Sequence, residues 1–299
     1  MIDLDGLRAF LIVAECQSFS QAAERLHLTQ PAVSKRIALL ESQMDTRLFD
    51  RIGRTVSLTE AGRHLEPRAR DILARVEDTQ RAIGSLSGSV AGQLSLATSH
   101  HIGLWRLPDV LRRYSAQHPG VALDLHFMDS EVAHEQIKQG NLELGIITLA
   151  PNAHDKLTSI PLWRDELVFM CSREHPLAGQ PAPALAAFAD QPAILPDMST
   201  FTGRIVKALF DREGLRLNVS MSTNYLETIR MLVTIGLGWS VLPRTMLADD
   251  LVELTVPGVD IHRMLGVIHH RQRMLSNAAL AFLDMMNLGT PNAPGPVPG

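Results

Sequence analysis

The hydrophobic residues of the first forty positions recur at helical spacing in three blocks. The first block covers residues 4–15. The second begins at Ser18, and Gln21 three positions later makes this a capping-box start. The third begins after Thr29, and its Pro31 falls in the first turn, where proline removes no internal hydrogen bond. The apolar positions of the three predicted helices are Leu7, Phe10, Leu11, Ala14, Ala22, Ala23, Leu26, Val33, Ile37 and Leu40.

The face of the third helix opposite its apolar stripe is small, polar and cationic. It carries Pro31, Ser34, Lys35, Arg36 and Ala38. The second and third helices together predict a helix-turn-helix, because long donors reach phosphates and base edges while small residues let the backbone approach the groove. An ordinary helical hairpin with a solvated face fits the pattern equally well.

The segment after the third helix predicts a wing. In LFDRIGRTVSLT, Gly53 supports a tight turn between two short extended segments. The stretch from Lys35 to Leu58 holds five cationic and three acidic residues, although the whole chain has a net charge of −4. A modest basic face on an acidic body is typical of a protein that binds selected DNA sites.

Residues 59–86 predict one long helix with an apolar seam of heptad type. Pro67 should kink this helix or mark its early part. At about 1.5 Å per residue the helix is about 40 Å long, and a dimerising linker of this length would separate two headpieces on a palindromic site. The alternative is a surface helix packed on its own core. The seam positions are Leu65, Ala69, Ile72, Val76, Thr79, Ile83 and Leu86.

Beyond a Gly/Ser-rich hinge at residues 84–92, predicted strands and helices alternate. This alternation indicates an α/β fold with a mostly parallel sheet. Two segments near Pro161 and His262 would cross between two subdomains as a hinge, and the Pro/Gly-rich tail from Gly289 predicts disorder. The predicted strands are 93–98, 121–128, 142–148, 166–171, 193–195, 218–222, 239–242 and 264–269, and the helices are 103–117, 130–139, 203–212, 225–234 and 277–286.

Polar side chains gather where predicted strands end and helices begin. Ligands of open α/β sheets bind at the carboxyl ends of strands, where helix N-termini attract anions. Short donors at these junctions suit a small anion or carboxylate, although Ser and Thr are also common helix caps. The candidate ligand-binding residues are Thr98, Ser99, His100, Thr148, Phe201, Thr202, Thr223 and Asn224.

Neither a metal site nor a catalytic site is predicted. The pairs His100-His101 and His269-His270, if each lies on a strand, point their two side chains to opposite faces, and no zinc-type spacing accompanies them. The sequence also lacks a Gly-rich phosphate loop, a nucleophile elbow and paired catalytic carboxylates in a suitable context. We therefore expect no enzyme, no metal and no cofactor.

The composition is that of a globular protein with apolar cores. The 299 residues are 45% hydrophobic and 20% charged, which fits two or three domains. No apolar run is long enough to span a membrane, and the acidic N-terminus does not resemble a signal peptide. Cys16 and Cys171 lie far apart, as expected for buried thiols rather than a disulfide. These features predict a cytoplasmic location.

A long N-terminal block resembles the DNA-binding domain of LysR-type transcriptional regulators. Its sequence is FSQAAERLHLTQPAVSKRIALLESQMDTRLFDR, followed by GRTVSLTEAG. The resemblance implies an α/β protein with an N-terminal all-α winged helix-turn-helix and a two-lobed effector domain similar to periplasmic binding proteins. The DNA contacts that it implies are Gln30, Pro31, Ser34, Lys35 and Arg36 in the recognition helix and Arg51 and Arg54 in the wing.

The pattern and the resemblance together divide the chain into five segments. Within the effector domain, lobe 1 would comprise about residues 93–161 and 263–288, and lobe 2 about residues 162–262. The five segments are the winged helix-turn-helix 1–58, the dimerising linker helix 59–86, the hinge 87–92, the effector-binding domain 93–288 and a disordered tail 289–299.

The resemblance also implies a function. A regulator of this type binds dyad operators in double-stranded DNA as a homodimer or homotetramer, contacts RNA polymerase at promoters and associates with no membrane. A small anionic metabolite between the lobes would shift their angle, and the linker helices would pass this change to the headpieces. Three segments further resemble a branch that activates sulfur-assimilation and redox genes: LATSHHIGLWRLP, MSTNYLETIRMLVTIGLGWSVLPRTML and HHRQRMLSNAALAFL.

Two other functions fit parts of the sequence. A cytoplasmic small-molecule-binding protein, whose N-terminal helices only dimerise it, would bind its ligand tightly and no discrete DNA sites. An enzyme in the α/β half would turn over a bound metabolite and lose activity when Thr98 or Ser99 is changed.

Overall fold

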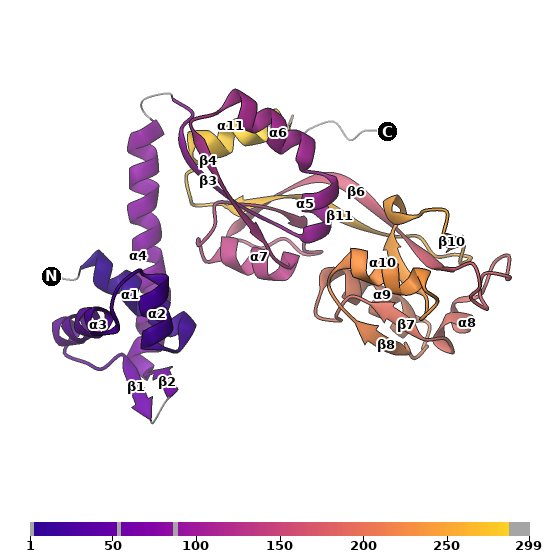
Figure 1. The fold of residues 1–299 in the computed structure, drawn as a ribbon, viewed down its shortest axis with the longest axis horizontal. Helices are drawn as coiled ribbons and strands as arrows, with labels where there is room; N and C mark the ends of the chain where they lie inside the picture. The colour runs from indigo at the N-terminus through magenta and orange to yellow at the C-terminus, as the bar shows by residue number, and fades with distance from the viewer. Residues whose placement is uncertain (1–2, 53–54, 86–88, 287–299) are drawn as a thin grey trace. The chain divides into compact units, whose positions relative to one another are not determined.

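The computed structural model describes residues 3–52, 55–85 and 89–286. The predicted turn residue Gly53 and the predicted disordered tail, 289–299, lie outside these residues. The chain divides into two compact units, residues 1–89 with 139–141, and residues 90–138 with 142–299. Their boundary falls in the predicted hinge, and Figure 1 shows the helices and strands of both units. Among the described residues, no helix is long and apolar enough to cross a membrane.

The N-terminal unit is a winged helix-turn-helix followed by one long helix. Its elements are α1 (Leu4–Cys16), α2 (Phe19–Arg25), α3 (Gln30–Met44), β1 (Phe49–Ile52), β2 (Thr55–Leu58) and α4 (Glu60–Ser85). Ser18 and Thr29 cap α2 and α3, because their hydroxyl oxygens accept hydrogen bonds from the backbone N–H groups of Gln21 and Ala32. His27, with a φ of 54°, makes the turn between these two helices. The sequence predicts both helix starts.

The apolar stripes of the first three helices meet in one core. The inner face of α3 is buried from Val33 to Leu40, as its spacing predicts. Phe49 at the base of the wing packs against two aromatic rings, with centroid distances of 5.3 Å to Phe10 and 5.8 Å to Phe19. The wing therefore starts from a fixed position on the helix-turn-helix.

The first half of α4 belongs to the same core. Leu65, Ala69 and Leu73 are buried in it, at positions i, i+4 and i+8 of the helix. The sequence pattern assigns Leu65 and Ala69 to a dimer seam, and this assignment does not hold for these two residues. Leu73 is not a position of the heptad seam, but it lies on the same side of the helix as Leu65 and Ala69. The three residues together form a stripe that packs on the unit's own core.

The outer seam positions of α4 are not used by this core. Ile72 and Thr79 are exposed, and Val76 is half-buried. The side chains of Ile83 and Leu86, the last two seam positions, lie outside the described residues. The dimerising role of this helix stays a prediction, and it concerns the face that begins at Ile72.

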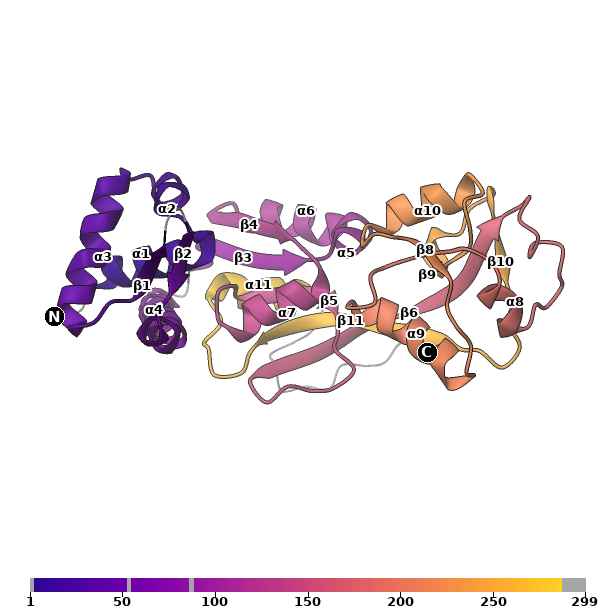
Figure 2. The same ribbon diagram turned by 90° about the horizontal axis from the view of Figure 1, so that it is seen from below.

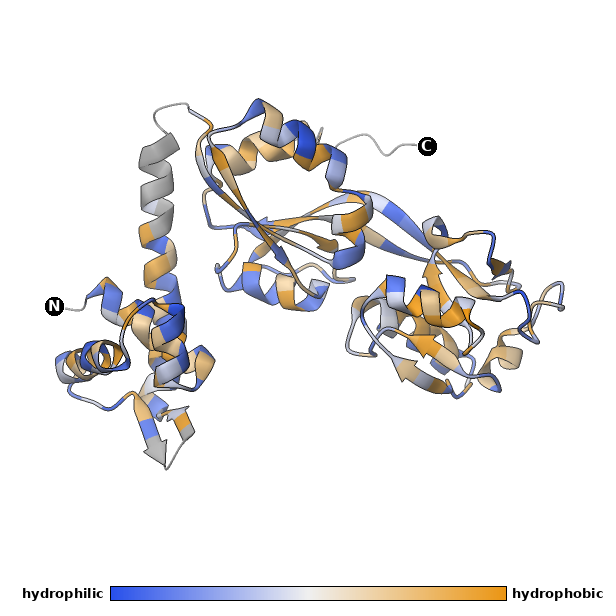
Figure 3. Ribbon diagram, viewed as in Figure 1, coloured by the Kyte–Doolittle hydropathy of each residue, from blue (hydrophilic) through white to orange (hydrophobic). Residues whose placement is uncertain are grey.

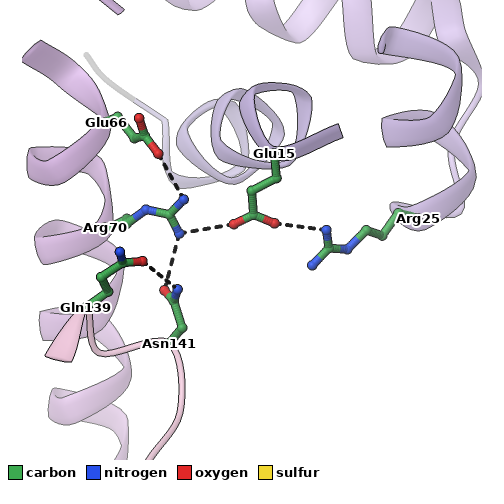
Figure 4. Close-up of polar contacts among 6 residues, drawn as sticks. All are labelled: Glu15, Arg25, Glu66, Arg70, Gln139 and Asn141. Carbon is green, nitrogen blue, oxygen red and sulfur yellow. Dashed lines mark hydrogen bonds and ion pairs between the residues drawn. The ribbon is translucent and has the colours of Figure 1, made fainter. Parts of the chain in front are cut away.

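A charged network joins α1, α2 and α4 (Figure 4). Glu15 accepts hydrogen bonds from Arg25 at 2.8 Å and from Arg70 at 3.0 Å, and Arg70 also donates to Glu66 at 3.0 Å. The Arg70 side chain is only 13% exposed, so its ion pairs are screened less by water than surface pairs are. The network helps to fix the direction in which α4 leaves the helix-turn-helix.

Lobe 1 of the C-terminal unit has a sheet between two layers of helices. Its elements are β3 (Gly92–Thr98), α5 (His100–Trp105), α6 (Pro108–Gln117), β4 (Val121–Phe127), α7 (Ser130–Lys138), β5 (Leu144–Thr148) and α11 (Asn277–Met285). Strands β4, β3 and β5 are parallel neighbours in that order. Helices α6 and α11 cover one face of the sheet and α7 the other, with hydrophobic strands between them (Figures 1 and 3).

Lobe 2 is built around a buried tryptophan. Its elements are α8 (Leu185–Ala189), β7 (Ala193–Leu195), α9 (Phe201–Arg212), β8 (Val219–Ser222), α10 (Leu226–Thr234), β9 (Ser240–Pro243), the 3-10 helix η1 (Arg244–Met246) and β10 (Leu251–Leu254). The ring of Trp239 packs against Phe188 and Phe210 at centroid distances of 5.0 Å and 5.8 Å, and its Nε1 donates to the Phe188 carbonyl at 3.1 Å. The sequence pattern misses α8 and β10, which are too short to show a period.

Two long strands, β6 (Leu157–Ser172) and β11 (Ile261–His270), run from lobe 1 into lobe 2 (Figure 2). They pair antiparallel with each other, and they also pair antiparallel with β5, β9 and β10. The prediction of a mostly parallel sheet is therefore wrong for the unit as a whole. Among the described strands, parallel pairing is limited to β3 with β4 and β5, and to β7 with β8. Pro161 and His262 lie in these two strands, where the sequence predicts the crossing.

The predicted helix 103–117 is in fact two helices. Helix α5 ends at Trp105, and α6 begins at Pro108, which has no N–H to continue the preceding helix but is suited to a first turn. His100 and His101 lie in the first turn of α5, so the strand geometry assumed for this pair does not apply.

We predict that Arg70→Ala loosens the junction of α1 with α4. The change removes a partly buried cation from Glu15 and Glu66, and hydrogen bonds between charged groups contribute about 1.5–3 kcal/mol. We expect a local loss of about 1–2 kcal/mol, measured in the full-length protein as roughly 5–30-fold faster hydrogen exchange of α1 amides.

The matched control is Arg68→Ala on the same helix. Arg68 is exposed and donates only to the carbonyl of His64, at 2.8 Å, among the described residues. Equal exchange rates in the two variants would contradict a structural role for the Arg70 network.

Candidate functional site

A cleft between lobe 1 and lobe 2 gathers polar side chains from both. It has a cavity volume of about 50 Å³, whereas one water molecule needs about 10–15 Å³. In this arrangement of the lobes the cleft thus holds only a few small groups. The lining residues are Ser99, His100, His101, Asp129, Ser130, Glu131, Thr148, Pro196, Thr200, Thr202, Asn224, Leu226 and Arg263.

Most of the predicted ligand-binding residues lie at this cleft. Those that line it are Ser99, His100, Thr148, Thr202 and Asn224. Thr98 does not line it, because its side chain is buried and its hydroxyl donates to the Ile146 carbonyl at 2.9 Å. Phe201 turns its side chain into the protein, and Thr223 accepts a hydrogen bond from the N–H of Tyr225 at 3.4 Å. This bond closes a short turn before α10 and is not a helix cap, because the N-cap of α10 is Tyr225, and Thr223 does not line the cleft.

Arg263 is the buried cation of the cleft, and the sequence pattern does not single it out. It lies on β11 directly opposite Asp165 on β6, and its Nε donates to Asp165 Oδ2 at 2.8 Å. Its Nη1 donates to the hydroxyl of Thr202 at 2.9 Å. Arg263 is only 7% exposed, and its Nη2 is buried without a hydrogen-bond partner among the described residues. Since an unsatisfied buried donor is costly, an acceptor brought by a ligand would be stabilised here.

Two acidic side chains at the start of α7 form the other charged part of the cleft. Glu131 accepts a hydrogen bond from the backbone N–H of Phe201 in the first turn of α9. Asp129 Oδ2 accepts from Asn224 Nδ2 at 2.7 Å. Both contacts join lobe 1 to lobe 2. Burial raises the pKa of Glu131, and the neighbouring Asp129 raises it further.

A third polar contact joins the lobes through Glu227 at the start of α10. Its Oε1 accepts from Trp105 Nε1 at 3.1 Å and lies 3.3 Å from His101 Nδ1. Burial lowers the pKa of His101, and the positive charge of Arg263 lowers it further. His101 is therefore a neutral hydrogen-bonding group at pH 7, and Arg263 is the fixed cation of the site.

The reactive side chains elsewhere do not form a second site of this kind. Among the described residues, no group of three or more His, Cys, Asp and Glu side chains is placed to hold a metal ion. Cys16 and Cys171 are free thiols. Burial raises the pKa of Cys171 to about 11, which makes this thiol a poor nucleophile at neutral pH.

In the N-terminal unit, α3 presents the predicted polar surface. Gln30, Pro31 and Lys35 are exposed, and Ser34 is half-buried. Gln30 Nε2 donates to Ser34 Oγ at 2.9 Å, so these two side chains are already oriented together. The surface has the donors that a DNA groove requires.

Arg36 on the same helix has an acidic neighbour that the sequence pattern does not reveal. Its Nη2 lies 3.5 Å from Asp5 Oδ2 on α1. A contact from Arg36 to a DNA phosphate would therefore compete with Asp5. The side chain of Arg51 and the whole of Arg54, the predicted wing contacts, lie outside the described residues.

Two regions of the chain match known protein families. Residues 4–63 match the bacterial regulatory helix-turn-helix proteins of the lysR family, and residues 87–288 match the LysR substrate binding domain. The chain is a LysR-type transcriptional regulator. As a member of this family it is a DNA-binding protein with an effector-binding domain, and it is not an enzyme. The family match favours this function over the alternative of a small-molecule-binding protein without specific DNA sites.

Relatives along nearly the whole chain are regulators of the same type. The HTH-type transcriptional regulator YeiE of Escherichia coli K12 is 32% identical over 288 residues, which cover 95% of this chain and 96% of YeiE. The structure of full-length CbnR complexed with its target DNA is similar with a TM-score of 0.63 at 20% identity, over 96% of this chain and 99% of CbnR. The effector binding domain of QuiR in complex with shikimate has a TM-score of 0.60 at 18% identity, over 68% of this chain and 99% of that domain. At these identities the two structures establish a shared fold.

We predict that Asp165→Ala strongly destabilises the C-terminal unit of this LysR-type regulator. The change leaves the Arg263 charge buried without its counter-ion, which costs about 3–5 kcal/mol. Urea unfolding of the full-length protein, followed by tryptophan fluorescence, measures this loss, because Trp105, Trp163 and Trp239 all lie in that unit.

Asp260→Ala, directly before β11, is the control. Its carboxylate pairs with Arg164 at 3.1 Å but is 78% exposed, so we expect a loss below about 1 kcal/mol. If the two variants lose the same stability, burial of the Arg263–Asp165 pair has no energetic consequence.

Proposed function

We propose that this regulator binds dyad operators in double-stranded DNA as a homodimer or homotetramer and that a small acidic metabolite in the interlobe cleft sets its activity. The observation that carries the ligand part is the buried, unpartnered Nη2 of Arg263 at the cleft. The DNA part rests on the family and on the exposed polar face of α3.

Base and phosphate contacts are proposed for the residues that the family resemblance implies. Lys35 is exposed and suited to phosphate, whereas Gln30 and Ser34 have the geometry for base edges or sugar-phosphate oxygens. An operator with two half-sites requires two headpieces, and the outer face of α4 from Ile72 onward is available to pair them. The full proposed set is Gln30, Pro31, Ser34, Lys35, Arg36, Arg51 and Arg54.

The donors at the cleft support an acidic effector. Arg263 Nη2 needs an acceptor, and the hydroxyls of Ser99 and Thr202 lie on the same cleft. An Arg–carboxylate pair out of water is among the stronger polar contacts that a protein can make. The similar fold of the QuiR domain in complex with shikimate supports a site for a small organic acid.

The effector would act by favouring one arrangement of the lobes. Strands β6 and β11 connect the lobes directly, so a change at the cleft reaches both. To change activity the ligand must bind one arrangement of the oligomer more tightly than the other. We place this regulator in the cytoplasm, at promoters with RNA polymerase, and its resemblance to regulators of sulfur and redox genes supports targets of that kind.

Capture of genomic DNA fragments by the purified full-length protein at physiological salt tests this function. We expect a few discrete sites with an imperfect dyad, and their occupancy should respond to added small organic acids. Salt-sensitive binding without sequence preference, in the presence and absence of these acids, would contradict the proposal.

We predict that Lys35→Ala weakens binding to such a site and lowers the slope of log affinity against log salt by about 1 for each headpiece, because one phosphate contact is lost. Lys156→Ala, an exposed lysine of the effector domain, is the control and should leave both quantities unchanged. A salt slope that Lys35→Ala does not change would remove Lys35 from the phosphate contacts.

A further inference from the structure

The charges around the cleft specify the effector beyond its acidic group. Building on the effector site proposed above, we infer that the effector is a small zwitterion of the α-amino acid type. Its carboxylate binds Arg263, and its ammonium group binds Asp129 and Glu131.

The charge balance of the cleft argues against a ligand that is only negative. The positive charge of Arg263 is paired with Asp165, which lies 2.8 Å away and is 2% exposed, and Arg106 Nη2 lies 3.9 Å from the other oxygen of this carboxylate. Asp129 and Glu131 line the same cleft, and in the part of the chain that the structure describes neither forms an ion pair, although the charge of Arg204 acts on Glu131. A plain anion would add a third negative charge beside them and would be repelled, whereas a zwitterion adds no net charge.

The hydrogen-bonding groups of the cleft also match the two charged ends of a zwitterion. Arg263 has one donor without an acceptor. Glu131 and Asp129 use one oxygen each, toward Phe201 and Asn224, although a carboxylate accepts up to about four hydrogen bonds. An ammonium group has three donors and no acceptor, so it complements these oxygens in a way that a second carboxylate does not.

The surroundings of Glu131 support a cation in this position. Burial raises its pKa by more than the backbone hydrogen bond from Phe201 and the charge of Arg204 lower it, so the charged form is only partly compensated in the protein alone. A bound ammonium group supplies that compensation. The cavity volume of about 50 Å³ restricts the ligand to a small side chain unless the lobes open.

Isothermal titration calorimetry on the full-length protein tests the inference with matched pairs of ligands. The probes are the common α-amino acids and, for each, the α-hydroxy acid of the same shape, such as alanine and lactate. We expect at least one amino acid to bind, and its hydroxy acid to bind at least about tenfold more weakly, a difference of about 1.4 kcal/mol.

Variants of α7 identify the group responsible. Glu131→Gln keeps an acceptor for the N–H of Phe201 but removes the charge, so it should abolish most of the preference for the amino acid. Glu135→Gln is the matched control, because Glu135 lies on the same helix, pairs with Lys138 and does not line the cleft. This control should keep the full preference.

Three results would overturn the inference. If the hydroxy acid binds as tightly as the amino acid while Arg263→Lys weakens both, the acidic effector stands and the zwitterion is wrong. If no amino acid binds below about 10 mM, or Glu131→Gln keeps the preference, the zwitterion is again wrong. If an amino acid binds and Arg263→Lys leaves its affinity unchanged, both the zwitterion inference and the effector site proposed above are wrong.

Discussion

The buried pair of Arg263 and Asp165 is the constraint on which the C-terminal unit depends. The two residues face each other across the antiparallel strands β11 and β6, the strands that connect the lobes. Because a shift of either strand by one residue would turn that strand's side chain to the other face of the sheet, the pair favours the observed register of the crossing. The same register brings the Arg263 guanidinium to the cleft and to Thr202 of lobe 2. Strand pairing and the proposed ligand site thus share one interaction.

The cleft is held nearly closed by side chains of the protein itself. Glu131 occupies a backbone donor at the start of α9, Asp129 holds Asn224, and Glu227 receives Trp105. Each contact crosses from one lobe to the other, so a ligand that enters must replace or rearrange them. Charged hydrogen bonds of this kind contribute about 1.5–3 kcal/mol each at most. A small ligand with two polar ends can offset such a cost. Hydrogen bonds to the ligand can therefore replace the hydrogen bonds between the lobes.

Most helices and strands can be predicted from the sequence, because their signals are local. The role of Arg263 cannot, because it depends on a partner far away along the chain. The caps Ser18 and Thr29 and the buried stripe of α3 depend on neighbours within a few positions, and the structure confirms them. Arg263 lies just before the predicted strand 264–269, and its partner Asp165 is far away along the chain. Nothing in either neighbourhood indicates that the two meet. Glu131 was missed for a related reason, because an acidic residue at a helix start is explained by the helix dipole alone.

The unpartnered donor of Arg263 is best understood as a functional feature rather than a source of stability. Buried ion pairs contribute little net stability, because desolvation of both charges cancels most of their attraction, and apolar residues of the same volume often stabilise a protein more. Here the pair also leaves one donor of the fork without an acceptor, which costs further free energy in the empty protein. An acceptor that binds there removes that cost, so the proposed effector site favours a ligand that completes the fork of Arg263 and also contacts the carboxylates of Asp129 and Glu131 at the start of α7.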